Sequence, residues 1–168
     1  MTEGGYISGQ SVTGEIVARG NVFRMYTTIL TLHSWLRWLA LIAGIMATVS
    51  AARGKGDKPG LVLTIALDTQ LLLGLILYIT QTLPSIQGRM AEVMKDPAAR
   101  FFAVEHITMM LGAVIATHVG RVLGRKGAPE TRNAKQMVCY GIATAFMLLA
   151  IPWPGLRAGR PLFRGLGI

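Results

Sequence analysis

The sequence predicts an all-α protein, a four-helix transmembrane bundle with a short interfacial helix between helices 2 and 3. Apolar residues make up 52 % of the 168 residues and charged residues only 15 %, whereas soluble domains have about 25 % charged residues. The charges also flank long apolar stretches, and Arg37 is the one basic residue that lies well inside a stretch. Positive charges between apolar spans are typical of membrane proteins.

Four apolar stretches are the predicted spans. They cover residues 22–51, 61–80, 101–123 and 137–153. A helix needs roughly 20 residues to cross a hydrocarbon core of about 30 Å, and a lipid-embedded backbone must bond internally, so the spans should be helical. The fourth is shorter and ends at Trp153, a typical interfacial anchor. We expect a polar tail over 1–24, a transmembrane domain over 25–156 and a basic tail over 157–168.

The segment between the second and third spans differs from the other loops. Pro84 suits the first turn of a helix, and Pro97 would end it. Between them apolar residues recur at i, i+4, i+7 and i+8, namely at Ile86, Met90, Val93 and Met94. One apolar face predicts a short helix lying in the membrane interface. An ordinary polar loop is the alternative.

Small residues recur every four positions on two of the spans. They are Gly112, Ala116 and Gly120 on the third span, and Ala40 with Gly44 and Ala43 with Ala47 on the first. Small residues let transmembrane helices approach closely. We therefore expect the first and third helices to pack tightly in the bundle, or to pack on a partner, which includes a second copy of the chain.

Charge distribution predicts the orientation and excludes one class of partner. The loops after the first and third spans are short, and they carry as many basic residues as the longer segments on the opposite side. The positive-inside rule then places these loops in the cytoplasm and both termini in the periplasm, for a bacterial inner-membrane protein. The pI near 10.5 does not indicate nucleic-acid binding, because the charges flank spans and do not form one basic face.

All three histidines lie inside predicted spans, where ionisable groups usually have a partner or a function. His33 is near the start of the first span and His106 near the start of the third. These spans cross in the same direction, so the two imidazoles should lie at similar depth. Two facing imidazoles in a bundle core could bind one haem iron. We expect His33 and His106 to be the ligands of one haem b.

Arg37 lies four residues after His33, on the same helix face. Its guanidinium could pair with a haem propionate. Apolar walls would come from Trp35, Trp38, Phe101, Phe102, Met109 and Met110. In the cofactor-free alternative, His33 and Arg37 extend toward lipid headgroups and Arg37 pairs with Glu105.

His118 lies about 18 Å further along the third helix than His106, toward the opposite membrane face. Three interpretations are open. His118 could bond to Asp68 of the second span, ligate a second haem with a residue of a partner chain, or help bind a quinone with Asp68 and Gln70. The simplest is the first, because it gives an intramembrane carboxylate a partner.

Other cofactor classes fit poorly. Cys139 is the single cysteine, so no disulfide forms within the chain, and no Cys-x-x-Cys-His motif for covalent haem is present. Carboxylates and histidines are too few for a di-iron or zinc enzyme.

Four segments carry a resemblance to a known family. They are HSWLRW (33–38), RFFAVEH (100–106), the segment from His118 to Arg121, and GRPLF (159–163). In them the chain resembles small bacterial four-helix membrane proteins labelled cytochrome b-like, over most of residues 25–163. The resemblance implies haem b, electron transfer with a redox partner, and His33 and His106 as first-choice ligands, with His118 next. Two-haem cytochromes b have four histidines on two helices, so one haem is expected here.

The expected function is that of a redox carrier or subunit in the lipid bilayer, with no bond-making catalysis. It would pass electrons between a membrane quinone pool or enzyme and a soluble carrier. Two alternatives stay open. One is a cofactor-free or chlorophyll-binding accessory subunit of a respiratory or photosynthetic complex. The other is a quinone-binding membrane enzyme that uses Asp68, Gln70 and His118.

Overall fold

The computed structural model describes the backbone of residues 9–162 and the side chains of residues 16–162. Within this range the chain is helical and contains no strand, as predicted. The long helices are α1 (Gly9–Ala52), α2 (Lys58–Leu77), α6 (His106–Lys126) and α7 (Arg132–Ala150). The outer parts of both predicted tails, and Phe163 of the GRPLF segment, lie outside the described residues.

Three helical segments are long and apolar enough to cross a membrane: Ile16–Ala52, Lys58–Ile86 and Pro97–Lys126. Each is longer than the corresponding apolar stretch of the sequence, because turns at its ends continue the helix. The fourth long helix, α7, is not in this class, since its first turns carry Arg132, Asn133, Lys135 and Gln136.

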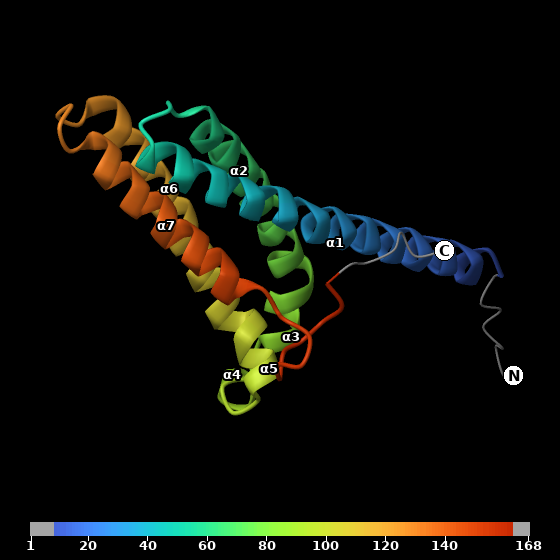
Figure 1. The fold of residues 1–168 in the computed structure, drawn as a ribbon. Coiled ribbons are helices and arrows are strands. Elements are labelled where there is room, and N and C mark those ends of the chain that lie inside the picture. The colour runs from blue at the N-terminus through green and yellow to red at the C-terminus, as the bar shows by residue number, and fades with distance from the viewer. Residues whose placement is uncertain (1–8, 163–168) are drawn as a thin grey trace, which may run out of the picture.

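The long helices are arranged so that α1 and α6 lie diagonally. α1 packs mainly on α2 and α7, and α6 packs mainly on the same two helices. Figure 1 shows the four converging near the α1–α2 and α6–α7 loops, while the N-terminal half of α1 leaves the bundle. The core between the helices is formed by Ala40, Ala43 and Ala47 of α1, Leu63 and Leu67 of α2, Ala113 of α6, and Tyr140, Ala143 and Met147 of α7.

The small-residue positions pack tightly within the bundle, as predicted, and the three glycines among them, Gly44, Gly112 and Gly120, face α7. A Cβ added at Gly112 would meet the ring of Phe146 at 3.0 Å, and one added at Gly120 would meet Cys139 Cβ at 2.9 Å. A Cβ at Gly44 would meet side chains of α7 as well, Met147 and Thr144. Periodicity placed these residues on a packed face, but it does not specify the neighbouring helix.

The connection between α2 and α6 also differs from the prediction of one interfacial helix. The helix of α2 continues through η1 (Tyr78–Thr82), a π-helical turn, into α3 (Leu83–Ile86). The wide turn lies just before Pro84, where a proline ring would clash with an ordinary α-helical turn. Gly88, with φ of +74°, then breaks the helix.

Two single turns complete this connection, α4 (Met90–Val93) and α5 (Pro97–Arg100). Asp96 caps α5 by accepting from the backbone N–H of Ala98 at 2.8 Å, so Pro97 begins the third long segment and does not only end a loop helix. A second π-helical turn, η2 (Phe101–Glu105), joins α5 to α6. Of the predicted apolar face, Ile86 and Val93 are buried with Ala103, while Met90 and Met94 are exposed.

Candidate functional site

A cavity of about 410 Å³ lies between α1, α2, α6 and the end of α7. It is on the side of the bundle where the diagonal helices α1 and α6 separate, near η1, η2 and the C-terminal segment. Its volume falls within the range of roughly 300–1,000 Å³ that is usual for small-molecule and cofactor sites. The lining is mainly apolar, with a few polar groups that include His33 and His106. This cavity is the candidate cofactor site.

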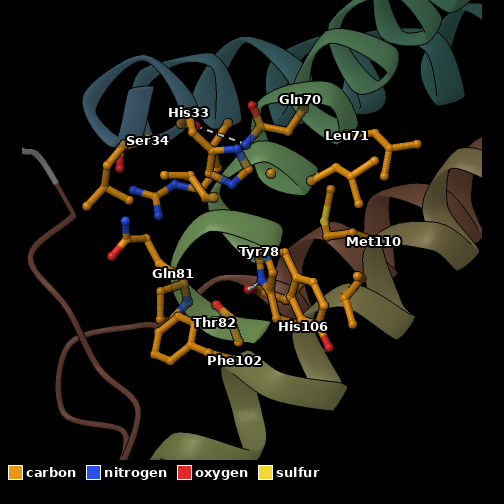
Figure 2. Close-up of a pocket in the computed structure, with 18 of the residues that line it drawn as sticks. His33, Ser34, Gln70, Leu71, Tyr78, Gln81, Thr82, Phe102, His106 and Met110 are labelled. Carbon is orange, nitrogen blue, oxygen red and sulfur yellow. Dashed lines mark hydrogen bonds between the residues drawn. The ribbon is translucent and has the colours of Figure 1, made fainter. Parts of the chain in front are cut away.

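His33 and His106 face one another across the cavity, from α1 and α6 respectively (Figure 2). Their ring centroids are 6.2 Å apart, with an angle of 62° between the ring planes. Two imidazoles that bind one metal from opposite sides, each through a bond of about 2 Å, have centroids about 6 Å apart. The predicted proximity of the two histidines is therefore present, although their helices are diagonal neighbours.

The surroundings of the ring nitrogens differ between these two histidines. His106 Nδ1 lies 2.8 Å from the carbonyl oxygen of Ala150 on α7. A carbonyl only accepts, so Nδ1 carries the proton and the lone pair of Nε2 is free, which is the usual arrangement of a metal-ligating histidine. His33 Nδ1 is buried without a hydrogen-bond partner in the described structure. His33 Nδ1 thus has no hydrogen-bond partner, and His106 Nε2 carries no proton.

His33 is held in place by α2. Gln70 Nε2 donates to the backbone carbonyl of His33 at 2.9 Å, and Gln70 itself is buried. One turn further along α2, a Cβ on Gly74 would meet the His33 ring at 3.0 Å. A glycine at this position therefore leaves the space that the imidazole occupies.

Two guanidinium groups line the cavity, those of Arg37 and Arg160. Arg37 Nη2 donates to the carbonyl oxygen of Leu162 at 2.7 Å, and Arg37 Nε is buried without a hydrogen-bond acceptor. The Arg160 guanidinium lies 4.3 Å from the centroid of the Phe102 ring. Among the described residues that line the cavity none is acidic. Two cations without a carboxylate favour a ligand that carries negative charge.

The pairing of Arg37 with Glu105, expected for a cofactor-free chain, is not formed. Glu105 instead accepts from Arg100 Nε at 2.6 Å, because both lie on the turns that lead into α6. Arg37 instead lines the cavity and bonds to the C-terminal segment at Leu162.

The walls include some of the predicted residues. Phe102 and Met110 line the cavity, and Phe101 contacts the His106 ring at a centroid distance of 5.9 Å. Trp38 instead packs on Trp153, with ring centroids 6.4 Å apart, and Trp35 is exposed. Tyr78 and Thr82 of η1 also line the cavity, and Tyr78 Oη donates to the Ala103 carbonyl in η2 at 3.1 Å. Both π-helical turns thus lie at the cavity, and such turns frequently occur at functional sites.

The residues of the predicted polar site are separated. His118 Nε2 and Asp68 Oδ1 are 2.9 Å apart, so the predicted hydrogen bond between them is confirmed. Both side chains are about half exposed on the outside of the bundle. Gln70 lies in the cavity with His33 instead. The three residues therefore do not form one quinone pocket.

Some residues of the cavity had no clear signal in the sequence. Arg160 lies in the predicted basic tail, and the sequence does not show that this segment folds back onto η2 and α1. Gly74 lies in an apolar run among leucines, where its role depends on the facing helix. The segment GRPLF was noted only for its resemblance, and it supplies Arg160 to the cavity.

Comparisons of the chain with protein-family models, with curated proteins and with solved structures found no match. The side chains of the cavity are therefore the basis for assigning a function.

Proposed function

We propose that the chain is a membrane b-type cytochrome that holds one haem b between His33 and His106. The observation that carries the proposal is the pair of imidazoles, 6.2 Å apart, inside a largely apolar cavity. Bound haem supplies one-electron oxidation and reduction. The resemblance of the sequence to cytochrome b-like membrane proteins also favours the binding of haem b.

Each polar group of the cavity has a role in this proposal. The carbonyl of Ala150 holds the His106 proton on Nδ1, which would leave Nε2 as the nitrogen available to bind iron. Gln70 and Gly74 position His33 from α2. Arg37 and Arg160 would bind the two propionates, since they are the cations of the lining. The protein would act as an electron carrier or subunit, exchanging electrons with a membrane enzyme or quinone pool and a soluble carrier.

The proposal includes a four-helix transmembrane bundle in a bacterial inner membrane. α7 would be the fourth span because it packs between α1 and α6 and buries the polar side chains of its middle part, while Arg132, Asn133 and Lys135 at its start are exposed. Gln136 and Tyr140 of α7 are buried, and the Tyr140 hydroxyl donates to Asp57 at 2.6 Å. Polar side chains that are satisfied inside the bundle do not prevent a helix from lying in lipid.

The test is a reduced-minus-oxidised absorption spectrum of the purified protein, beside three histidine variants. We expect a b-type band in the wild type, its loss in His33→Ala and in His106→Ala, and its retention in His118→Ala. The last variant is the matched control, because His118 is a histidine of the same helix as His106 but lies outside the cavity.

Three outcomes would overturn the proposal. Absence of a band from a folded sample made in haem-sufficient cells would indicate a cofactor-free accessory subunit. Absorption in the red would indicate chlorophyll. A band that survives both the His33 and the His106 substitutions would place the haem elsewhere.

A further inference from the structure

The hydrogen-bonded pair of Asp68 and His118 is not used by the proposed haem site. It lies on the outside of the bundle, where α2 and α6 are in contact. The two side chains are 49 % and 52 % exposed, and neither lines the cavity. An intramembrane carboxylate with a histidine partner therefore faces away from the protein.

The pair lies at the depth of the hydrocarbon core if the bundle spans the membrane as proposed. Asp68 is four residues from the middle of the segment Lys58–Ile86, and His118 is about seven from the middle of Pro97–Lys126. At 1.5 Å per residue these offsets are about 6 and 10 Å, less than the half-thickness of about 15 Å. Ionisable groups that face lipid at this depth are costly, so a polar cover is expected.

The surface around the pair is apolar and regular. Exposed side chains flank Asp68 and His118 at spacings of four and three residues along each helix: Leu61, Ile65 and Leu72 on α2, and Leu111, Ile115 and Val122 on α6. This is the spacing of a helix–helix contact seam. We refer to these eight residues as the α2–α6 face.

The pair is complementary to a second copy of itself. A two-fold axis along the membrane normal keeps both copies at one depth and exchanges left for right. Asp68 of each copy then lies opposite His118 of the other, so that four groups alternate donor and acceptor. Two-fold interfaces require this self-complementarity, and polar side chains that bond across helices stabilise membrane helix association.

We propose that the α2–α6 face is the interface of a homodimer, closed at its centre by the two Asp68–His118 pairs. The proposal rests on the membrane placement proposed above and not on haem. Its failure is therefore separable from that of the haem site, because the haem band can be recorded on the same samples.

The first experiment measures the mass of the wild type in lipid nanodiscs and in mild detergent. We expect twice the 18.1 kDa of one chain, with dissociation on dilution. Asp68→Leu and His118→Leu should each weaken the dimer about tenfold or more, as expected for loss of two symmetric interhelical polar contacts. The matched control is Val138→Leu, an exposed position of α7 outside the face, which should leave the dimer unchanged.

The decisive experiment mixes the two variants, each with a different fluorescent label. Neither variant can form the pair within its own chain. A mixed dimer, however, brings His118 of the Asp68→Leu chain opposite Asp68 of the His118→Leu chain. We expect mixed dimers well above the proportion given by random mixing, measured by energy transfer in vesicles.

Two results would overturn the proposal. One is a wild type that stays monomeric at high protein-to-lipid ratio, which would leave lipid or a small lipid-soluble ligand as the cover. The other is random mixing of the two variants, which would mean that the pair acts only within one chain. Circular dichroism and the haem band of each sample show whether a variant that fails to associate is still folded.

Discussion

At the scale of single residues, Gly74 is a position where α2 leaves room for the ring of a proposed iron ligand. A methyl group there would be 3.0 Å from Cε1 and 3.6 Å from Nδ1 of the His33 ring, so the imidazole would have to shift by a few tenths of an ångström. We expect Gly74→Ala to lower haem affinity about tenfold, the size typical of changes to groups that orient metal ligands. Haem titration of the apoprotein measures this.

Gly141→Ala is the control for this prediction. A Cβ at Gly141 would meet only Thr48 Cγ2, at an ordinary 3.9 Å, so haem affinity should not change. Equal affinities of the two alanine variants would contradict the role given to Gly74.

The two arginines of the cavity are expected to influence the reduction potential of the proposed haem. Positive charge near a haem favours the reduced form, which carries one more electron. We expect Arg37→Gln and Arg160→Gln to lower the reduction potential by tens of millivolts, where about 59 mV is a tenfold change for a one-electron couple. Redox titration followed by absorbance measures the potential.

Arg157→Gln is the matched control for Arg160, since both arginines are exposed residues of the same segment but Arg157 does not line the cavity. A potential that falls equally in both variants would show a long-range surface-charge effect and not a contact with the cofactor.

At the scale of elements, the contact between α6 and α7 depends on glycines. A Cβ at Gly120 would lie 2.9 Å from Cys139 Cβ, an atom next to the backbone that cannot rotate away. The methyl group of Gly120→Ala must therefore move the helices apart. We expect a loss of about 1–3 kcal/mol in stability, as is typical of overpacking, measured by thermal unfolding in detergent.

Gly20→Ala provides the comparison, because nothing lies within 4 Å of a Cβ at Gly20. Replacement of an exposed helical glycine by alanine should stabilise the helix slightly. If both alanines had the same effect, close approach of α6 and α7 would not be the reason for Gly120.

The helices also show which features of the fold the sequence patterns could predict and which they could not. Small residues at intervals of four predicted tightly packed faces, and Gly112 and Gly120 are on such a face. Periodicity describes one helix at a time, so it did not reveal that α7 is the neighbour. Hydropathy likewise predicted the long helices but missed the turns at their ends. The π-helical turns were not predicted, because they depend on how the rest of the fold packs around Pro84 and the start of α6.

In the candidate site, too, some residues were predicted from the sequence and others were not. Matched depth along two parallel spans predicted that His33 and His106 could meet if the first and third helices faced one another, and they do lie close together. Similar depth also favoured the bond between Asp68 and His118 among three interpretations, and this bond is formed. Arg160 was not predicted, because its position depends on an irregular segment. That segment returns to the cavity through contacts such as the bond from Arg37 to Leu162.

At the scale of the whole molecule, the two short loops lie at one end of the bundle and the turns α3 to α5 at the other (Figure 1). We expect the short loops to be cytoplasmic, because basic residues accumulate in short cytoplasmic loops. A reporter enzyme that is active only in the periplasm should work when fused at the C-terminus. It should be inactive when inserted at Gly56, a loop glycine with φ of +87°. The opposite pattern would invert the orientation.

The length of α1 has a geometric consequence. Its 44 residues extend about 66 Å, roughly twice the hydrocarbon thickness, and its N-terminal half leaves the bundle as one unbroken helix (Figure 1). Arg19, Tyr26 and His33 are seven residues apart and differ by only about 20° per step around the axis. The helix therefore fixes the direction, around its axis, in which the side chains of its outer half point relative to the His33 imidazole. One residue inserted between Tyr26 and His33 would turn that outer half by about 100°.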